Sequence, residues 1–109
     1  MREALEKMLS AGREDALLRF SLGNACLGED DAGAAVGHFR RAVELDPGYS
    51  AAWKMLGRAL EAAGDRAGAM DAWRRGIEAA GARGDVQAGK EMGVFLKRAE
   101  KAAREGGER

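Results

Sequence analysis

The sequence has no threonine, one proline, one cysteine and one histidine among its 109 residues. Valine and isoleucine are also few, so the chain lacks the β-branched residues that a fold of many short strands requires. Its single cysteine, Cys26, excludes an internal disulfide. One histidine and one cysteine cannot supply a zinc site of the usual four-ligand kind, and we expect neither a metal nor another cofactor.

The chain also lacks any long apolar run and any excess of one charge. No stretch approaches the roughly 20 apolar residues that a helix needs to cross a bilayer. Acids in the first six residues differ from the basic start and apolar stretch of a secretion signal. Basic and acidic residues both number 18, so the net charge of zero gives no general attraction to nucleic acid or anionic lipid. We therefore expect a cytoplasmic protein that binds neither nucleic acid nor membranes.

Alanine, the strongest helix former, dominates the composition. The apolar residues recur at spacings of three and four, as in Ala35, Phe39 and Ala42. This period places them on one face of an α-helix. The predicted fold class is all-α. Apolar residues at 46% and charged residues at 33% fit a single domain with a modest core.

Glycine, proline and aspartate residues divide the chain into six predicted helices. Asp31, Asp65 and Asp85 are each positioned to cap the free N–H groups of a first turn. Asp46 is expected to cap a further helix with Pro47 at its first position, where no N–H is needed. The predicted helices are 2–11, 14–28, 31–45, from 47 to the stop at Gly64, 66–80 and 85–104, with a loop at 81–84 and a frayed tail at 105–109.

The chain matches itself when it is shifted by 34 residues. Residues 16–49 and 50–83 share eight identities in this alignment, including Leu-Gly at 22–23 and at 56–57. The matches fall in helical order. Self-similarity at this period indicates helical hairpins that stack because neither can bury its apolar faces alone.

The two segments resemble tetratricopeptide repeats (TPRs), whose pattern combines a large residue, Leu-Gly, a bulky residue, alanine, an aromatic residue, alanine and proline. In the first repeat these positions are Arg19, Leu22, Gly23, Cys26, Ala35, Phe39, Ala42 and Pro47. In the second they are Trp53, Leu56, Gly57, Leu60, Ala69, Trp73, Gly76 and Gly81. Arg19 departs from the pattern and is expected to weaken one contact, and Gly81 indicates a change of spacing. The resemblance implies antiparallel hairpins stacked as a right-handed superhelix, an α-α solenoid.

Incomplete repeats are predicted at both ends of the chain. Three residues of the first helix lie 34 positions before members of the repeat pattern: Met1, Leu5 and Met8 before Ala35, Phe39 and Ala42. The helix at 2–11 is therefore expected to be the second half of a repeat that covers one end. Met92-Gly93 follows Leu56-Gly57 by 36 residues, so the helix at 85–104 is expected to be a first helix that caps the other end with a polar outer face.

The resemblance implies that the first helix of each pair lines a concave groove, which holds a peptide or helix of a partner protein. The groove positions are Leu17, Phe20, Asn24, Leu27, Lys54, Arg58, Glu61, Gln87, Lys90, Val94 and Lys97. Four are cations and one is a carboxylate, so we predict a mildly acidic segment with an apolar side chain near Phe20 and Leu27. Its affinity should fall with salt. The alternative interpretation is that these residues are ordinary solvated helix faces.

Other functions have less support. One TPR subfamily grips a C-terminal carboxylate, and Asn24 matches its pattern, but Phe20, Met55, Gln87 and Glu91 stand where its other polar residues belong. The segment 84–91 resembles a phosphate-binding loop but ends in Glu91 instead of Ser or Thr and follows a helix. We therefore predict neither a carboxylate clamp nor a nucleotide site.

No catalytic constellation is present, so we predict a scaffold or adaptor and not an enzyme. His38 is expected to face solvent without a partner, and Cys26 to be an inert thiol in the core. A structural function stays open as the alternative. In it the domain, a monomer or weak homodimer, self-associates through its last helix or caps a larger assembly.

Overall fold

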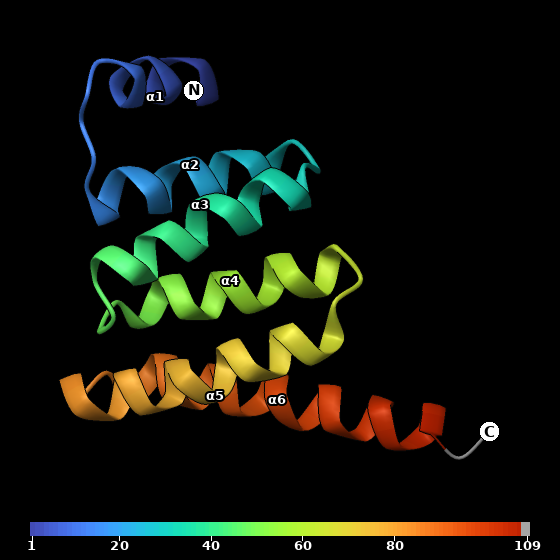
Figure 1. The fold of residues 1–109 in the computed structure, drawn as a ribbon. Helices are drawn as coiled ribbons and strands as arrows, with labels where there is room; N and C mark the ends of the chain where they lie inside the picture. The colour runs from blue at the N-terminus through green and yellow to red at the C-terminus, as the bar shows by residue number, and fades with distance from the viewer. Residues whose placement is uncertain (108–109) are drawn as a thin grey trace.

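The computed structural model describes residues 1–107, which form six α-helices and no strand (Figure 1). The helices are α1 (Arg2–Ser10), α2 (Ala16–Gly28), α3 (Ala32–Leu45), α4 (Ser50–Ala62), α5 (Arg66–Arg83) and α6 (Val86–Gly107). They stack in chain order, from α1 at one end to α5 and α6 at the other. The all-α helical-repeat prediction is confirmed. Among the described residues, no helix has the length and apolar character that crossing a membrane requires.

Aspartate side chains begin four of the helices. Each accepts a hydrogen bond from the backbone N–H three residues later, at 2.7 Å for Asp15, 3.2 Å for Asp31, 2.9 Å for Asp65 and 3.2 Å for Asp85. These bonds satisfy N–H groups that have no partner inside the helix. The caps predicted at Asp31, Asp65 and Asp85 are confirmed. Asp15 is a fourth cap, and it explains why α2 begins at residue 16 and not at 14.

The prediction that Pro47 starts a helix is wrong, because residues 46–49 close a turn first. The carboxylate of Asp46 accepts from Gly48 N–H at 3.3 Å, and Tyr49 N–H donates to the Asp46 carbonyl at 3.0 Å. Pro47 lies inside this turn, and α4 begins only after Tyr49. The Pro47 carbonyl also accepts a hydrogen bond from Trp53 Nε1 at 2.8 Å. The turn is thereby tied to the first turn of α4.

Three other predicted ends are also wrong. The segment 81–84, expected as a loop, is helical through Arg83, and Gly84 ends α5 with a left-handed φ of 74°. Residues 105–107, expected in a frayed tail, belong to α6, while 108–109 lie outside the described residues. At the other end α1 stops at Ser10 and not at 11. Gly12, with a φ of 98°, turns the chain toward α2.

Each internal helix pair crosses where a glycine faces an aromatic ring. A Cβ atom at Gly23 would overlap the ring of Phe39, and one at Gly57 would overlap that of Trp73. Both rings are buried, with exposed fractions of 0% and 1%. The indole Nε1 of Trp73 donates to the Lys54 carbonyl at 3.2 Å, so its burial leaves no polar group unsatisfied. The aromatic positions of the repeat pattern, Phe39 and Trp73, therefore lie in the core.

One continuous core runs along the stack from α2 to α6. Met92 of α6 is completely buried in it, as expected for a first helix that packs on the preceding repeat. Cys26 is also completely buried, which confirms its predicted place in the core. Burial raises the pKa of the Cys26 thiol, so the reactive thiolate is disfavoured there.

We predict opposite stability effects for two Gly→Ala substitutions. Gly57→Ala should lower the free energy of unfolding by about 1–3 kcal/mol, because the new methyl group overpacks the crossing with Trp73. Gly37→Ala should raise it by about 0.5–1 kcal/mol, because Gly37 is exposed on α3 with open space around it and alanine is the better helix former. Urea unfolding followed by far-UV circular dichroism measures both. A Gly57→Ala variant that is as stable as the wild type, or more stable, would contradict the close crossing.

Candidate functional site

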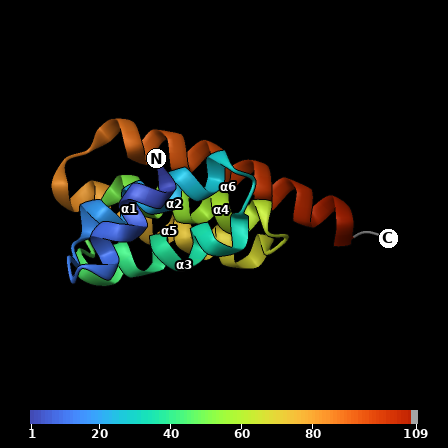
Figure 2. The same ribbon diagram turned by 90° about the horizontal axis from the view of Figure 1, so that it is seen from above.

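The stack is curved, with α2, α4 and α6 on its inner side. α2 contacts α4 and α4 contacts α6, whereas within residues 1–107 no Cα atom of α3 comes within 8 Å of one in α5. The first helices of the repeats therefore converge and the second helices diverge. A view along the stack shows the two sets on opposite sides (Figure 2). We call the side formed by α2, α4 and α6 the inner face.

The predicted groove residues differ in how much of each side chain is accessible. Phe20, Leu27 and Lys54 are partly buried. The others are exposed: Leu17, Asn24, Arg58, Glu61, Gln87, Lys90, Val94 and Lys97. Lys90 lines a hollow with Ile77 and Ala80 of α5, so it belongs to a different side of α6 from the contact with α4.

On α6 the residues that meet α4 lie one position beyond Lys90, Val94 and Lys97. They are Glu91, Phe95 and Arg98. Sequence reasoning named Glu91 only in the rejected carboxylate clamp and phosphate-binding loop, and it missed Phe95 and Arg98 as groove residues. A signal was available, because the three residues recur at spacings of four and three and so share one face of a helix.

The ammonium group of Lys54 is already paired. Its Nζ lies 3.0 Å from Glu91 Oε1, and both side chains are partly shielded from solvent. The pair joins α4 to α6 across the inner face. One of the four cations predicted to attract a partner is therefore largely neutralised within the chain.

Three side chains stack on one another between the core and the inner face. The ring of Phe95 lies 5.5 Å from that of Trp73, and the Arg58 guanidinium lies 5.4 Å from the centre of the Phe95 ring. The second contact is a cation–π interaction. These three side chains, with Glu61 and Arg98, line a hollow of about 140 Å³, which we call the arginine hollow.

Positive charge exceeds negative charge around the arginine hollow. A neighbouring hollow of about 370 Å³ shares Glu61 and Arg98 and adds Arg66 to its lining. Three guanidinium groups thus surround one carboxylate near Ala62, where α4 ends. The negative end of the α4 dipole favours cations there, while Arg66 is the first residue of α5, whose positive end favours an anion. The arrangement can bind a carboxylate through planar, bidentate hydrogen bonds from an arginine.

The part of the inner face on α2 is apolar. The ring of Phe20 packs edge-on against Phe39 at 5.9 Å and tilted against Tyr49 at 5.0 Å. These contacts join the first repeat to the start of α4 and leave part of the ring accessible. Leu17 beside it is 59% exposed, and Leu27 is partly buried. We call Leu17, Phe20 and Leu27 the apolar patch.

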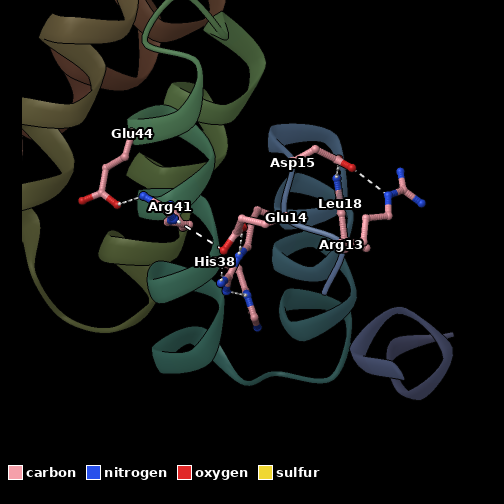
Figure 3. A network of polar contacts seen from close by, with 8 residues as sticks. Arg13, Glu14, Asp15, Leu18, His38, Arg41 and Glu44 are labelled. Carbon is pink, nitrogen blue, oxygen red and sulfur yellow. Dashed lines mark hydrogen bonds and ion pairs between the residues drawn. The ribbon is translucent and has the colours of Figure 1, made fainter. Parts of the chain in front are cut away.

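A polar network lies where α2 contacts α3 (Figure 3). Arg19 donates to both oxygens of Glu14, at 2.8 and 2.9 Å, and its Nη1 lies 3.1 Å from His38 Nδ1. Arg41 reaches the same carboxylate at 3.6 Å. The hydrogen bond from Arg19 is the main cause that lowers the pKa of Glu14. Arg19, which departs from the TPR pattern, therefore forms a set of charged contacts in place of the expected apolar one.

The expectation that His38 is a solvent-facing residue without a partner is wrong. Its side chain is partly buried beneath Arg19, so the ring nitrogen that faces the guanidinium acts as an acceptor. Burial lowers the pKa of His38, and the positive charge of Arg19 lowers it further. Both effects favour the neutral imidazole.

The opposite face of the stack has a hollow of its own that sequence analysis did not predict. It measures about 430 Å³ and lies between α3, α4 and α5, where the second helices diverge. Val43, Leu56, Leu60 and Ala72 are among its apolar lining residues, and charged side chains are present at its edge. It shares no lining residue with the arginine hollow.

Comparisons with known proteins agree with this architecture. Residues 27–92 match the family described as the tetratricopeptide repeat. A TPR repeat-containing protein of Pseudomonas aeruginosa is 54% identical over 102 residues, which is 94% of this chain and 97% of that protein.

Two solved structures are also similar. The solution structure of a Bordetella parapertussis protein is 47% identical, with a TM-score of 0.80 over 94% of this chain and 89% of that chain. The crystal structure of the Sgt2 TPR domain from Aspergillus fumigatus is 25% identical, with a TM-score of 0.85 over 99% of this chain and 69% of that chain. Both likenesses extend beyond the two central repeats, because they cover nearly the whole chain.

We predict that His38 titrates below its ordinary pKa of 6.5. It is the only histidine, so its imidazole protons give an unambiguous NMR titration. Arg19→Met should move the pKa back toward 6.5, because one of the two causes is removed. The folded protein binds this proton less readily than the unfolded chain, so the free energy of unfolding should fall as pH drops through 6.5.

A His38→Gln variant is the matched control for the stability measurement. Glutamine keeps an acceptor for Arg19 but does not titrate, so urea midpoints on either side of pH 6.5 should differ less than in the wild type. A His38 pKa above 6.5 would contradict the observed arrangement.

Proposed function

The chain belongs to the tetratricopeptide repeat family, whose members generally bind other proteins, and from that premise we propose a non-catalytic module that captures a peptide or helix of a partner on its inner face. The proposed segment is mildly acidic and carries an apolar side chain. The observation that supports it most is the exposure of Arg58 and Arg98 around one hollow, beside Phe95.

Two features of the inner face would recognise such a segment together. A carboxylate of the partner would enter the arginine hollow, where the guanidinium of Arg58 is oriented by its contact with Phe95. An apolar side chain would rest on the apolar patch, where Leu17 and part of Phe20 are open to solvent. Burial of these side chains would contribute affinity, while the charges would contribute orientation and association rate.

The charges on the inner face do not contribute equally to this proposal. Lys54 is held by Glu91 at 3.0 Å, so a partner carboxylate would have to displace Glu91 to reach it. Arg58 and Arg98 have no carboxylate partner among the ion pairs of the described residues. We therefore assign the principal electrostatic attraction to the two arginines. Glu61 in the same hollow repels an acidic partner.

We predict that charge substitutions around the arginine hollow change acidic-peptide affinity in opposite directions. The probe is a fluorescent peptide of alternating glutamate and leucine, and its lysine–leucine counterpart is the control. Arg58→Glu and Arg98→Glu should each weaken binding of the acidic peptide roughly tenfold, and Glu61→Gln should strengthen it. Fluorescence anisotropy measures the affinities. Added salt should lower the wild-type affinity.

Two further variants separate this mechanism from a general effect of positive charge. Lys54→Met removes a cation that is already paired and should have a smaller effect than Arg58→Glu. Phe20→Ala should weaken the leucine-containing peptide but leave the salt dependence unchanged. Equal binding of the acidic and basic peptides, or insensitivity to both arginine variants, would rule the proposal out.

A further inference from the structure

The first helix has an open apolar face. In the complete first repeat, Ala35 and Ala42 of α3 are fully buried. The equivalent residues are Met1, which directly precedes α1, and Met8 within it, and they are 95% and 39% exposed. No residue of α1 is buried, because among the described residues no first helix lies against that side. α1 is thus the second half of a repeat whose first half is absent from residues 1–107.

The last helix, α6, also has a side that no other helix covers among the described residues. The glycines at the two internal crossings are filled by the rings of Phe39 and Trp73. Gly93 occupies the same pattern position in α6, and a Cβ atom there would meet nothing within 4 Å. No second helix lies against this side of α6 within the described residues.

The polar outer face expected for α6 is interrupted at this opening. Val86 is 65% exposed. A mainly apolar hollow of about 350 Å³ continues from Val86 along Gly89 to Ile77 and Ala80 of α5. The end of the stack therefore presents apolar surface beside its exposed lysines.

The side-chain sizes of the two open faces match each other. In the second repeat a large residue on the first helix, Trp53, faces a small one on the second, since a Cβ atom at Gly76 would come within 2.7 Å of Trp53 Cβ. At the ends the sizes are reversed. On α6 the pattern position of Trp53 is occupied by Gly89, 36 residues later. On α1 the pattern position of Gly76 is occupied by Met8, two repeat lengths earlier. A small residue on α6 thus corresponds to a large one on α1.

The central crossing follows the same rule. Leu5 of α1 holds the position of Phe39 and Trp73, and Gly93 of α6 holds that of the glycines that receive those rings. Large-to-small contacts pack without voids or overlap. At these two positions the side-chain sizes of the open faces therefore complement each other.

We propose that α1 of a second copy of this chain docks against the open face of α6, so that two chains complete one repeat between them. Leu5 and Met8 of one copy then lie over Gly93 and Gly89 of the other. The contact is head-to-tail, because the two surfaces are different. Each pair keeps one free α1 and one free α6, so longer arrays form as concentration rises. The inner face continues across the junction, and this proposal does not depend on the arginine hollow.

The test blocks each face separately in the full chain. Gly93→Gln places a side chain in the open crossing of α6, and Met8→Asp places a charge on the open face of α1. Gly93 is helical with free space around it, so glutamine fits the single chain and, as the better helix former, should also stabilise it. Gly37→Gln is the matched control, since it adds the same side chain to the exposed side of α3.

Sedimentation equilibrium over a range of concentrations should show self-association of the wild type and of Gly37→Gln. Gly93→Gln and Met8→Asp should each sediment as monomers. Circular dichroism establishes that both variants remain folded. Wild-type protein that stays monomeric at every concentration would overturn the proposal, as would variants that associate like the wild type.

Mixing the two blocked variants gives the sharpest result. Met8→Asp retains an intact α6 and Gly93→Gln retains an intact α1, so an equimolar mixture should form heterodimers that cannot extend further. A mixture that stays monomeric while the wild type associates would indicate a two-fold symmetric or unrelated contact and would also overturn the proposal. Acidic-peptide affinity measured on the same variants should be unchanged in the monomers, which keeps a failure here distinct from a failure of the peptide-binding proposal.

Discussion

The close approach of a glycine to an aromatic ring sets the geometry of this protein. Where Gly23 meets Phe39 and Gly57 meets Trp73, the absence of a side chain lets two helices cross with a full ring between them. This spacing determines how each hairpin presents its other faces to its neighbours. Trp73 also influences the packing beyond its own repeat. Phe95 of α6 packs on its ring, and the Arg58 guanidinium stacks on the ring of Phe95. The groups that orient the candidate site are thus continuous with the core.

Electrostatics divide the inner face into groups that stabilise the fold and groups that stay available to a partner. Lys54 and Glu91 hold α4 and α6 together, whereas Arg58 and Arg98 surround a hollow that contains one carboxylate. A chain with no net charge can therefore have a locally cationic surface. Charged groups also stabilise the fold where α2 meets α3, since Arg19 pairs with Glu14 and takes the place of an apolar contact.

The first and last helices of the stack each have a side that differs from the interior. A repeat buries its apolar faces only against neighbours, so the first and last helices each retain one side without a contact among the described residues. Met8 is exposed on α1 and Gly93 is uncovered on α6, in the reverse of the size order found inside the stack. The peptide binding proposed for the inner face and the self-association proposed for the ends would use separate surfaces.

The sequence by itself determined the all-α class, the 34-residue repeat, three of the four aspartate caps and the pattern residues of the glycine–aromatic crossings, because these depend on periodicity and on contacts inside one hairpin. Only the tertiary structure decided that Lys54 pairs with Glu91, that Phe95 supports Arg58 and that Arg19 covers His38. The first two contacts join residues 37 positions apart on different hairpins, and the rotation of one helix against the next selects them. A change of one residue in that register exchanges Lys90 for Glu91. The spacing of Glu91, Phe95 and Arg98 indicates that they share one helix face, but only the tertiary structure decided that this face meets α4.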